Sequence, residues 1–240
     1  AGKLVDDATL LTALEKIERV NAGEPITFFE AGTAAAFDLF AETPADWLLL
    51  EVGLGGRFVS TNVIEHPAAC VITPVSHDHA DFLGGIFKRG AQGVIGYQSD
   101  EALRVLEGCA RRAGAPCIFA ERDFNVREEN GRLIFDDERG LLDLAAPKLP
   151  GRHQYQNAAT AIATLRAIAP EIPNAAFDAG MKIVDWPARL QRVSRGRLVA
   201  LAPAGSEIWI DGGHNEDGAR VAAEAMGERA ARSDAPLVLI

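Results

Sequence analysis

The sequence predicts an α/β fold, a mostly parallel sheet with helices on both faces. Two observations support this prediction. A 15-residue helical pattern, DEALRVLEGCARRAG, joins two apolar runs and suits a crossover between parallel strands. Short, nearly all-apolar and β-rich runs also recur, as in central strands covered on both faces; they are 46–52 (DWLLLEV), 68–75 (AACVITPV), 92–98 (QGVIGYQ) and 116–121 (PCIFAE).

Two helices are predicted before the first of these runs. Residues 7–21 carry leucine, isoleucine and valine near helical spacing, and Gly23 follows as a stop. Residues 27–42 have small and apolar side chains on one side, and Thr27 with Glu30 forms a capping box.

After residue 121 the pattern changes from crossovers to hairpins. Asn130-Gly131 lies between two alternating runs in 124–137, which is the strongest short hairpin signal. Residues 153–169 predict a helix rich in small side chains, and 196–213 predict a second hairpin-like pair. A helix over 216–232 and a strand over 235–240 complete the series.

The connection from 76 to 92, SHDHADFLGGIFKRGAQ, has no convincing helical face. A parallel crossover usually contains a helix and at least about 10–12 residues. Either the strands on its two sides are not parallel neighbours, or residues are absent near 84–85. We expect two domains, 1–192 and 193–240, with this gap inside the first.

Charge and composition exclude several classes of protein. A net charge of −10 argues against broad binding to nucleic acid, which relies on clustered Lys and Arg. The three cysteines lack metal-site spacing and predict reduced core residues. No apolar run approaches the roughly 20 residues of a membrane helix, and no signal-peptide pattern is present. We expect a cytoplasmic protein without membrane or nucleic-acid partners.

Glu51 ends an apolar run and is followed by Gly53, Gly55 and Gly56. Ligands of open parallel sheets bind beyond the carboxyl ends of strands. A carboxylate at such an end, with His79 at the next, could hold a magnesium ion beside a phosphate. The alternative is a tight strand-to-helix turn with a histidine that only caps a helix. The phosphate-binding pattern G-x-x-x-x-G-K-[ST] is absent from this sequence.

Six stretches, read together, resemble folylpolyglutamate synthase and its bifunctional dihydrofolate synthase relatives, members of the Mur ligase superfamily. They occur in register as TFFEAGTAAAF, EVGLGGRFVSTNVI, VITPVSHDHADFLG, GRHQYQNAATAI, WPARLQ and DGGHNEDGA. The resemblance implies a Mur ligase-type ATP-binding domain and the start of a smaller, Rossmann-like C-terminal domain, the glutamate-ligase domain. It also implies ATP-dependent amide formation between L-glutamate and a folate or dihydropteroate carboxylate, through an acyl phosphate. We expect a monomer.

The resemblance assigns roles to individual residues. Glu51 and His79 match the family's magnesium ligands and are the implied catalytic residues. Thr27 and Phe29 match positions that line the pterin pocket, although an aromatic residue on a helix is equally often part of a core.

The implied contacts with ATP lie later in the chain. Asn157 and Arg189 match family residues that contact ATP across the domain boundary. Asp211 and His214 match the pair that the following domain brings to the nucleotide. Gln154 and Gln191 belong to the same motifs and either share this role or only cap helices.

Three departures from the family pattern keep other functions open. The family's phosphate loop should precede residue 1, and the helix with the carbamylated lysine has no counterpart, since Lys88 matches a later lysine. Val59 stands where the family has an acid that contacts the pterin. The chain in this sequence is therefore expected not to catalyse the reaction. The alternatives are a Mur-type ligase for another carboxylate and an inactive relative that serves as an interaction module.

Overall fold

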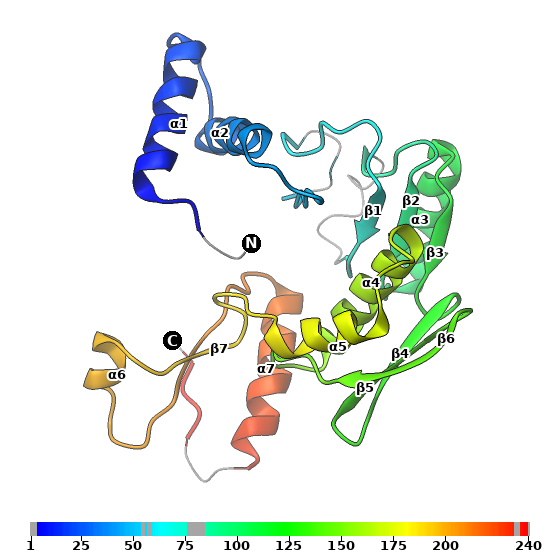
Figure 1. Cartoon of the computed structure of the whole chain (residues 1–240). Helices are drawn as coiled ribbons and strands as arrows, with labels where there is room; N and C mark the ends of the chain where they lie inside the picture. The colour runs from blue at the N-terminus through cyan, green and yellow to red at the C-terminus, as the bar shows by residue number, and fades with distance from the viewer. Residues whose placement is uncertain (1–3, 54–55, 57–58, 76–84, 233–235, 240) are drawn as a thin grey trace. The chain divides into compact units, whose positions relative to one another are not determined.

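The computed structural model describes residues 4–53, 56, 59–75, 85–232 and 236–239, and Figure 1 labels its helices and strands. The chain divides into a smaller unit, Ala1–Glu65 with Asp81–Ile86, and a larger one, His66–Ala80 with Phe87–Ile240. The predicted α/β class is confirmed, because helices are combined with a parallel sheet.

The smaller unit contains the two predicted helices, α1 (Asp7–Asn21) and α2 (Phe28–Glu42), which pack against each other. The capping box of α2 is present, since Thr27 accepts from the Glu30 amide and the Glu30 carboxylate accepts from the Thr27 amide. The predicted strand over 46–52 is wrong: this segment is irregular, and Leu49 is 88% exposed. A strand needs a partner for its backbone groups, and no described strand pairs with this run.

The larger unit holds a parallel sheet in the order β1-β2-β3. Its strands are β1 (Ala69–Ile72), β2 (Gln92–Ile95) and β3 (Cys117–Phe119), and α3 (Asp100–Ala113) joins the last two. Three of the four predicted strands and the crossover helix are thus confirmed. β1 and β2 are parallel neighbours, so the alternative that they are not adjacent is wrong.

Gly93 at the centre of this sheet lies between two cysteines, paired in register with Cys70 on one side and Cys117 on the other. A Cβ at this position would lie 2.2 Å from Cys117 Sγ and 3.3 Å from the Phe87 ring. Gly93→Ala is therefore expected to destabilise the protein by about 1–3 kcal/mol through overpacking. Urea denaturation measures the change.

Two variants test the cause of this loss. Gly180→Ala lies in a helix with open space around it, so it should leave stability unchanged or raise it by roughly 0.5–1 kcal/mol. Adding Cys117→Ala to Gly93→Ala should recover most of the lost stability. A Gly93→Ala protein as stable as the wild type would contradict the close packing of Gly93 against Cys117 and Phe87.

An antiparallel sheet follows, with β4 (Phe124–Glu129), β5 (Arg132–Asp137) and β6 (Gly140–Ala145). The predicted hairpin turn is confirmed, because Asn130 and Gly131 have φ of 53° and 72°, as a type I′ turn requires. The third strand, β6, was not predicted.

Helix α4 (His153–Ile168) contacts β1 and β2 of the parallel sheet as well as β4 and β5. Three of its seven buried residues are alanine, and these small side chains let the helix lie close to both sheets. The core between them includes Phe124, Leu133, Phe135, Ala159 and Ile162.

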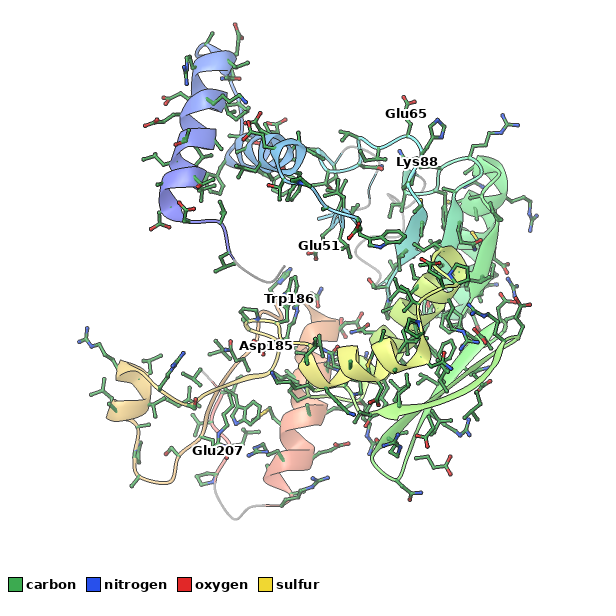
Figure 2. The ribbon with its side chains drawn as sticks, in the orientation of Figure 1. Glu51, Glu65, Lys88, Asp185, Trp186 and Glu207 are labelled. Carbon is green, nitrogen blue, oxygen red and sulfur yellow. The ribbon has the colours of Figure 1, made fainter. Side chains whose placement is uncertain are left out.

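The C-terminal elements are α5 (Asn174–Ile183), β7 (Gln191–Val193), α6 (Arg197–Leu201), β8 (Ile208–Ile210) and α7 (Glu216–Ala230). The hairpin-like pair predicted over 196–213 is wrong. Its first half forms α6, and β8 instead pairs antiparallel with β7. The ion pairs of Glu207 with Arg192 and Arg229 favour this arrangement, because they join β7 and α7 to the start of β8; Figure 2 labels Glu207.

Residues 236–239 form no strand, and Leu239 is 96% exposed, so the strand predicted over 235–240 is wrong for these four residues. Residues 235 and 240 lie outside the described part. Across the described ranges, each helix is too short or too polar to cross a membrane.

Candidate functional site

Two of the motifs are joined by the side chain of Asp211, which follows β8. Its Oδ2 accepts a hydrogen bond from the Leu190 amide at 2.8 Å, and its Oδ1 accepts one from the Gly213 amide at 2.7 Å. The Gly212 amide donates to the Ala188 carbonyl at 2.8 Å. The WPARLQ and DGGHN segments are therefore fixed side by side.

The loop around Arg189 has a strained backbone. Ala188 and Leu190 adopt φ of 55° and 43°, a left-handed conformation that costs a non-glycine residue roughly 1–3 kcal/mol. The bonds to Asp211 and Gly212 offset this cost. The exposed Arg189 side chain lies between the two strained positions, and its Nη1 is 3.8 Å from where a Gly212 Cβ would be.

His214 and Asn215 continue the same loop into α7. Nδ1 of His214 lies 3.0 Å from the Gly212 carbonyl oxygen, which can only accept, so this ring nitrogen is the donor. Asn215 caps α7 by accepting from the Gly218 amide at 2.9 Å. The loop thus presents Arg189, Asp211 and His214 beside a helix N-terminus, where an anion would be favoured.

The start of α4 carries a chain of three polar side chains. Asn157 Nδ2 donates to Gln154 Oε1 at 3.2 Å, and Gln154 Nε2 lies 2.8 Å from His153 Nε2. Gln154 is 7% exposed. It bonds its neighbours instead of capping the helix by a side-chain bond, and Gln191 Oε1 accepts from the Ala188 amide in the strained loop.

His153, the first residue of α4, lies near the strained loop. Burial lowers the pKa of this imidazole; Asp211 acts against the shift, Arg189 adds to it and Glu224 opposes it. These charges place His153 near the Asp211 loop. Sequence reasoning did not single out His153, and its place beside Gln154 in the HQYQN motif was the available signal.

Thr27, Phe29 and Glu51 are the candidate residues of the smaller unit. Thr27 caps α2, and Phe29 in its first turn is 52% exposed. Glu51 is exposed in an irregular segment, with its carbonyl accepting from Thr61 Oγ1 at 2.8 Å; Figure 2 labels it. His79 lies outside the described residues, so its pairing with Glu51 stays a prediction.

Within the described residues, no group of three or more His, Cys, Asp or Glu side chains is arranged to hold a metal ion. The glycine loop after Glu51 is described only at Gly53 and Gly56. Gly56 has a φ of 87°, and its carbonyl accepts from Asn62 Nδ2 at 2.6 Å. This geometry fits a tight turn.

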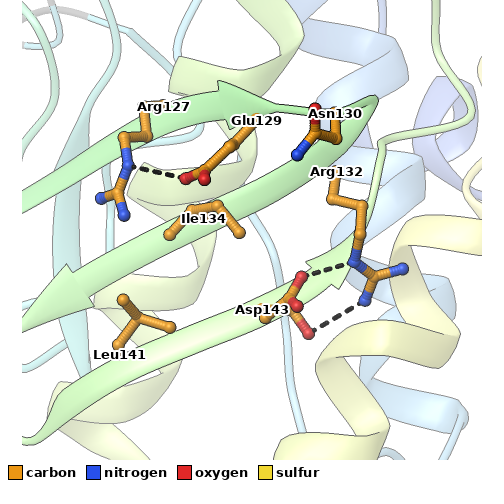
Figure 3. Close-up of a pocket in the computed structure, with 7 residues that line it drawn as sticks. All are labelled: Arg127, Glu129, Asn130, Arg132, Ile134, Leu141 and Asp143. Atoms are coloured by element: carbon orange, nitrogen blue, oxygen red, sulfur yellow. Dashed lines mark hydrogen bonds and ion pairs between the residues drawn. The ribbon is translucent and has the colours of Figure 1, made fainter.

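A hollow of about 200 Å³ lies on the exposed face of the β4–β6 sheet. Figure 3 shows that its arginines already face carboxylates, with Arg127 paired to Glu129 and Arg132 to Asp143. None of the candidate residues lines this hollow, so it is separate from the candidate site.

No protein-family model matches the chain. The chain is 35% identical to dihydrofolate synthase/folylpolyglutamate synthase of Bacillus subtilis (strain 168), over 92% of the chain and 54% of that protein. It is 32% identical to folylpolyglutamate synthase of Lacticaseibacillus casei, over 88% of the chain and 52% of that protein.

A solved FPGS–AMPPCP–folate complex superposes with a TM-score of 0.81 at 30% identity, over 98% of this chain and 61% of the other. The chain thus spans about half the length of the curated relatives it matches.

Proposed function

The chain is a homologue of the folylpolyglutamate and dihydrofolate synthases, and we propose that its protein is an ATP-dependent ligase that joins L-glutamate to a folate-type carboxylate. The observation that carries this proposal is the 35% identity to a dihydrofolate synthase/folylpolyglutamate synthase across 92% of the chain. On this proposal, residues 1–192 belong to the ATP-binding domain and 193–240 begin the glutamate-ligase domain.

The proposed reaction has two steps. The carboxylate of the folate attacks the γ-phosphate of ATP and forms an acyl phosphate, and ADP leaves. The amino group of glutamate then attacks the acyl carbon and loses a proton, a C–N amide bond forms, and the C–O bond to phosphate breaks, with its electron pair leaving on the phosphate. Catalysis of this kind is mostly the positioning of reactants and the stabilisation of phosphoryl charge.

The residues of this chain would hold the nucleotide. Asn157 and Arg189 contact ATP from one side of the domain boundary, and Asp211 and His214 from the other. The hydrogen bonds of Asp211 support this role, because they hold the loop of Arg189 against the loop of His214.

The metal ligands are proposed to be Glu51 and His79. The Glu51 carboxylate fits this role, because it is exposed and is a hard oxygen ligand of the kind that Mg²⁺ prefers, with waters and phosphate oxygens at the other positions of the ion. Bound Mg²⁺ would neutralise charge on the phosphates. Thr27 and Phe29 would line the pterin pocket.

One observation favours a carboxylate substrate other than a folate. Val59 is half-buried and apolar where the family has an acid. An apolar side chain cannot form the hydrogen bond that an acid gives to a pterin. The alternative is therefore a Mur-type ligase of the same fold that extends another carboxylate.

The test uses the protein at its natural length, with ATP, magnesium and glutamate. Tetrahydrofolate, dihydropteroate or a UDP-linked muramyl peptide is added as acceptor, and phosphate release and product mass are measured. We expect release that depends on both glutamate and a folate, and its loss in Glu51→Gln. Phosphate release with the muramyl peptide but with neither tetrahydrofolate nor dihydropteroate would support the alternative, a Mur-type ligase. Absence of Mg-ATP binding would instead indicate a non-catalytic interaction module.

A further inference from the structure

We propose that His153 and Gln154 are positioning residues that fix the side-chain amide of Asn157, so that Asn157 presents its Oδ1 to the nucleotide. The three side chains form a relay at the start of α4. The inference rests on the proposed function, because that proposal makes Asn157 a nucleotide contact. It adds two residues whose role is to orient that contact.

The first step places the imidazole of His153 against Gly151. Gly151 has a φ of 105°, a conformation that strains other residues. A Cβ there would lie 2.4 Å from His153 Cε1 and 2.6 Å from its Nδ1, and 3.6 Å from Leu190 Cδ1. Glycine thus lets the ring lie directly against the backbone, next to the strained loop.

The second step fixes the protonation of His153. The Gln154 amide nitrogen, 2.8 Å from His153 Nε2, can only donate. The ring nitrogen must therefore accept, which requires a neutral imidazole with its proton on Nδ1. Burial lowers the pKa of His153 and favours the neutral form, with Asp211, Arg189 and Glu224 as the charged groups that act on it.

The third step passes this orientation to Asn157. With the Gln154 nitrogen directed at His153, its Oε1 is left to accept from Asn157 Nδ2 at 3.2 Å. The Asn157 amide nitrogen is then engaged, and its Oδ1 is the end that faces a ligand. Turning the Gln154 amide over would place its Nε2 against Asn157 Nδ2, where two donors would face each other, and would require the ring proton on His153 Nε2. At 7% exposure, Gln154 has little access to water that could replace the lost contact.

Two substitutions of similar volume separate orientation from packing. Gln154→Met removes both contacts, whereas Gln154→Glu keeps an acceptor for Asn157. In the natural-length protein, calorimetric titration with ADP should show about threefold to tenfold weaker binding for Gln154→Met, the effect of one misplaced hydrogen bond. Gln154→Glu should bind ADP within about twofold of the wild type.

A second measurement reads His153 directly and does not depend on nucleotide. Nitrogen-15 NMR of the histidine rings should show neutral His153 with its proton on Nδ1 in the wild type, and a doubly protonated ring in Gln154→Glu. His153→Gln assigns the signal, and thermal melting checks that each variant is folded.

Unchanged ADP binding in folded Gln154→Met, or a wild-type His153 proton on Nε2, would overturn the relay. A wild-type protein that fails to bind ADP would overturn the proposed function and the nucleotide role of Asn157. In that case an Nδ1 proton on His153 would still support the relay itself.

Discussion

Replacement of Asp137 by alanine is expected to lower the free energy of unfolding by about 3–5 kcal/mol, because it leaves a buried guanidinium without its carboxylate. Asp137 at the end of β5 lies 2.8 Å from Nη2 of Arg166 on α4, and the two side chains are 11% and 7% exposed. Nε of Arg166 is also buried and has no hydrogen-bond partner among the described residues. Urea denaturation followed by circular dichroism measures the loss.

The ion pair belongs to a larger connection between the antiparallel sheet and α4. Asp137 Oδ1 accepts from the Arg139 amide at 2.8 Å, and Arg139 Nη1 donates to the Arg166 carbonyl at 2.9 Å. Asp137→Ala therefore removes an acceptor at the turn between β5 and β6 as well as the charge.

Asp143→Ala is the matched control on the neighbouring strand. Its partner is Arg132, and both side chains are about half exposed, so the loss should be about 0–1 kcal/mol. If Asp137→Ala lowered the free energy of unfolding no more than Asp143→Ala, the buried Asp137–Arg166 ion pair would not stabilise the protein more than an exposed pair does.

Local sequence signals predicted much of the fold. The Thr27–Glu30 capping box and the Asn130-Gly131 turn depend on residues at most three positions apart, so the sequence contains the whole interaction. Residues 100–114 are similarly long enough to form the helix that a crossover between the parallel strands β2 and β3 requires. Such elements are predictable because their stabilising contacts are close in the sequence.

The wrong predictions concern partners far away in the chain. Residues 46–52 have strong β character, but a strand exists only where another strand pairs with it. The pattern over 196–213 predicts that its two halves pair with each other, whereas β8 pairs with β7, which Asp211 and Gly212 hold in place. The hydrophobic pattern alone does not specify which two strands pair with each other.

The candidate site was predicted residue by residue through the resemblance, and its supports were not. Asp211 and Arg189 were singled out, but the two backbone bonds of Asp211 and the strained Leu190 depend on three-dimensional geometry. His153 was missed for the same reason. Its importance follows from contacts with Gly151 and Gln154 that a motif does not display.

Asp211→Ala is expected to weaken ADP binding by about a hundredfold, roughly 2.7 kcal/mol. Each of its bonds to the Leu190 and Gly213 amides is charge-assisted and contributes about 1.5–3 kcal/mol. Without them the strained conformation around Arg189 relaxes, and the loop of His214 is released at the same time. Arg189 and His214, two of the proposed nucleotide contacts, then lose their fixed positions. Calorimetric titration of the natural-length protein with ADP measures the effect.

Two variants show whether the carboxylate acts through the loops. Asp211→Asn keeps one acceptor oxygen and loses the charge, so its ADP affinity should lie between those of the wild type and Asp211→Ala. Asp217→Ala removes an exposed carboxylate from the first turn of α7, where it pairs with Arg220 at 3.4 Å, and should change ADP affinity less than about threefold because surface pairs contribute little. An Asp211→Ala protein that is folded and binds ADP as well as Asp217→Ala would show that the Asp211 bonds do not organise a nucleotide site.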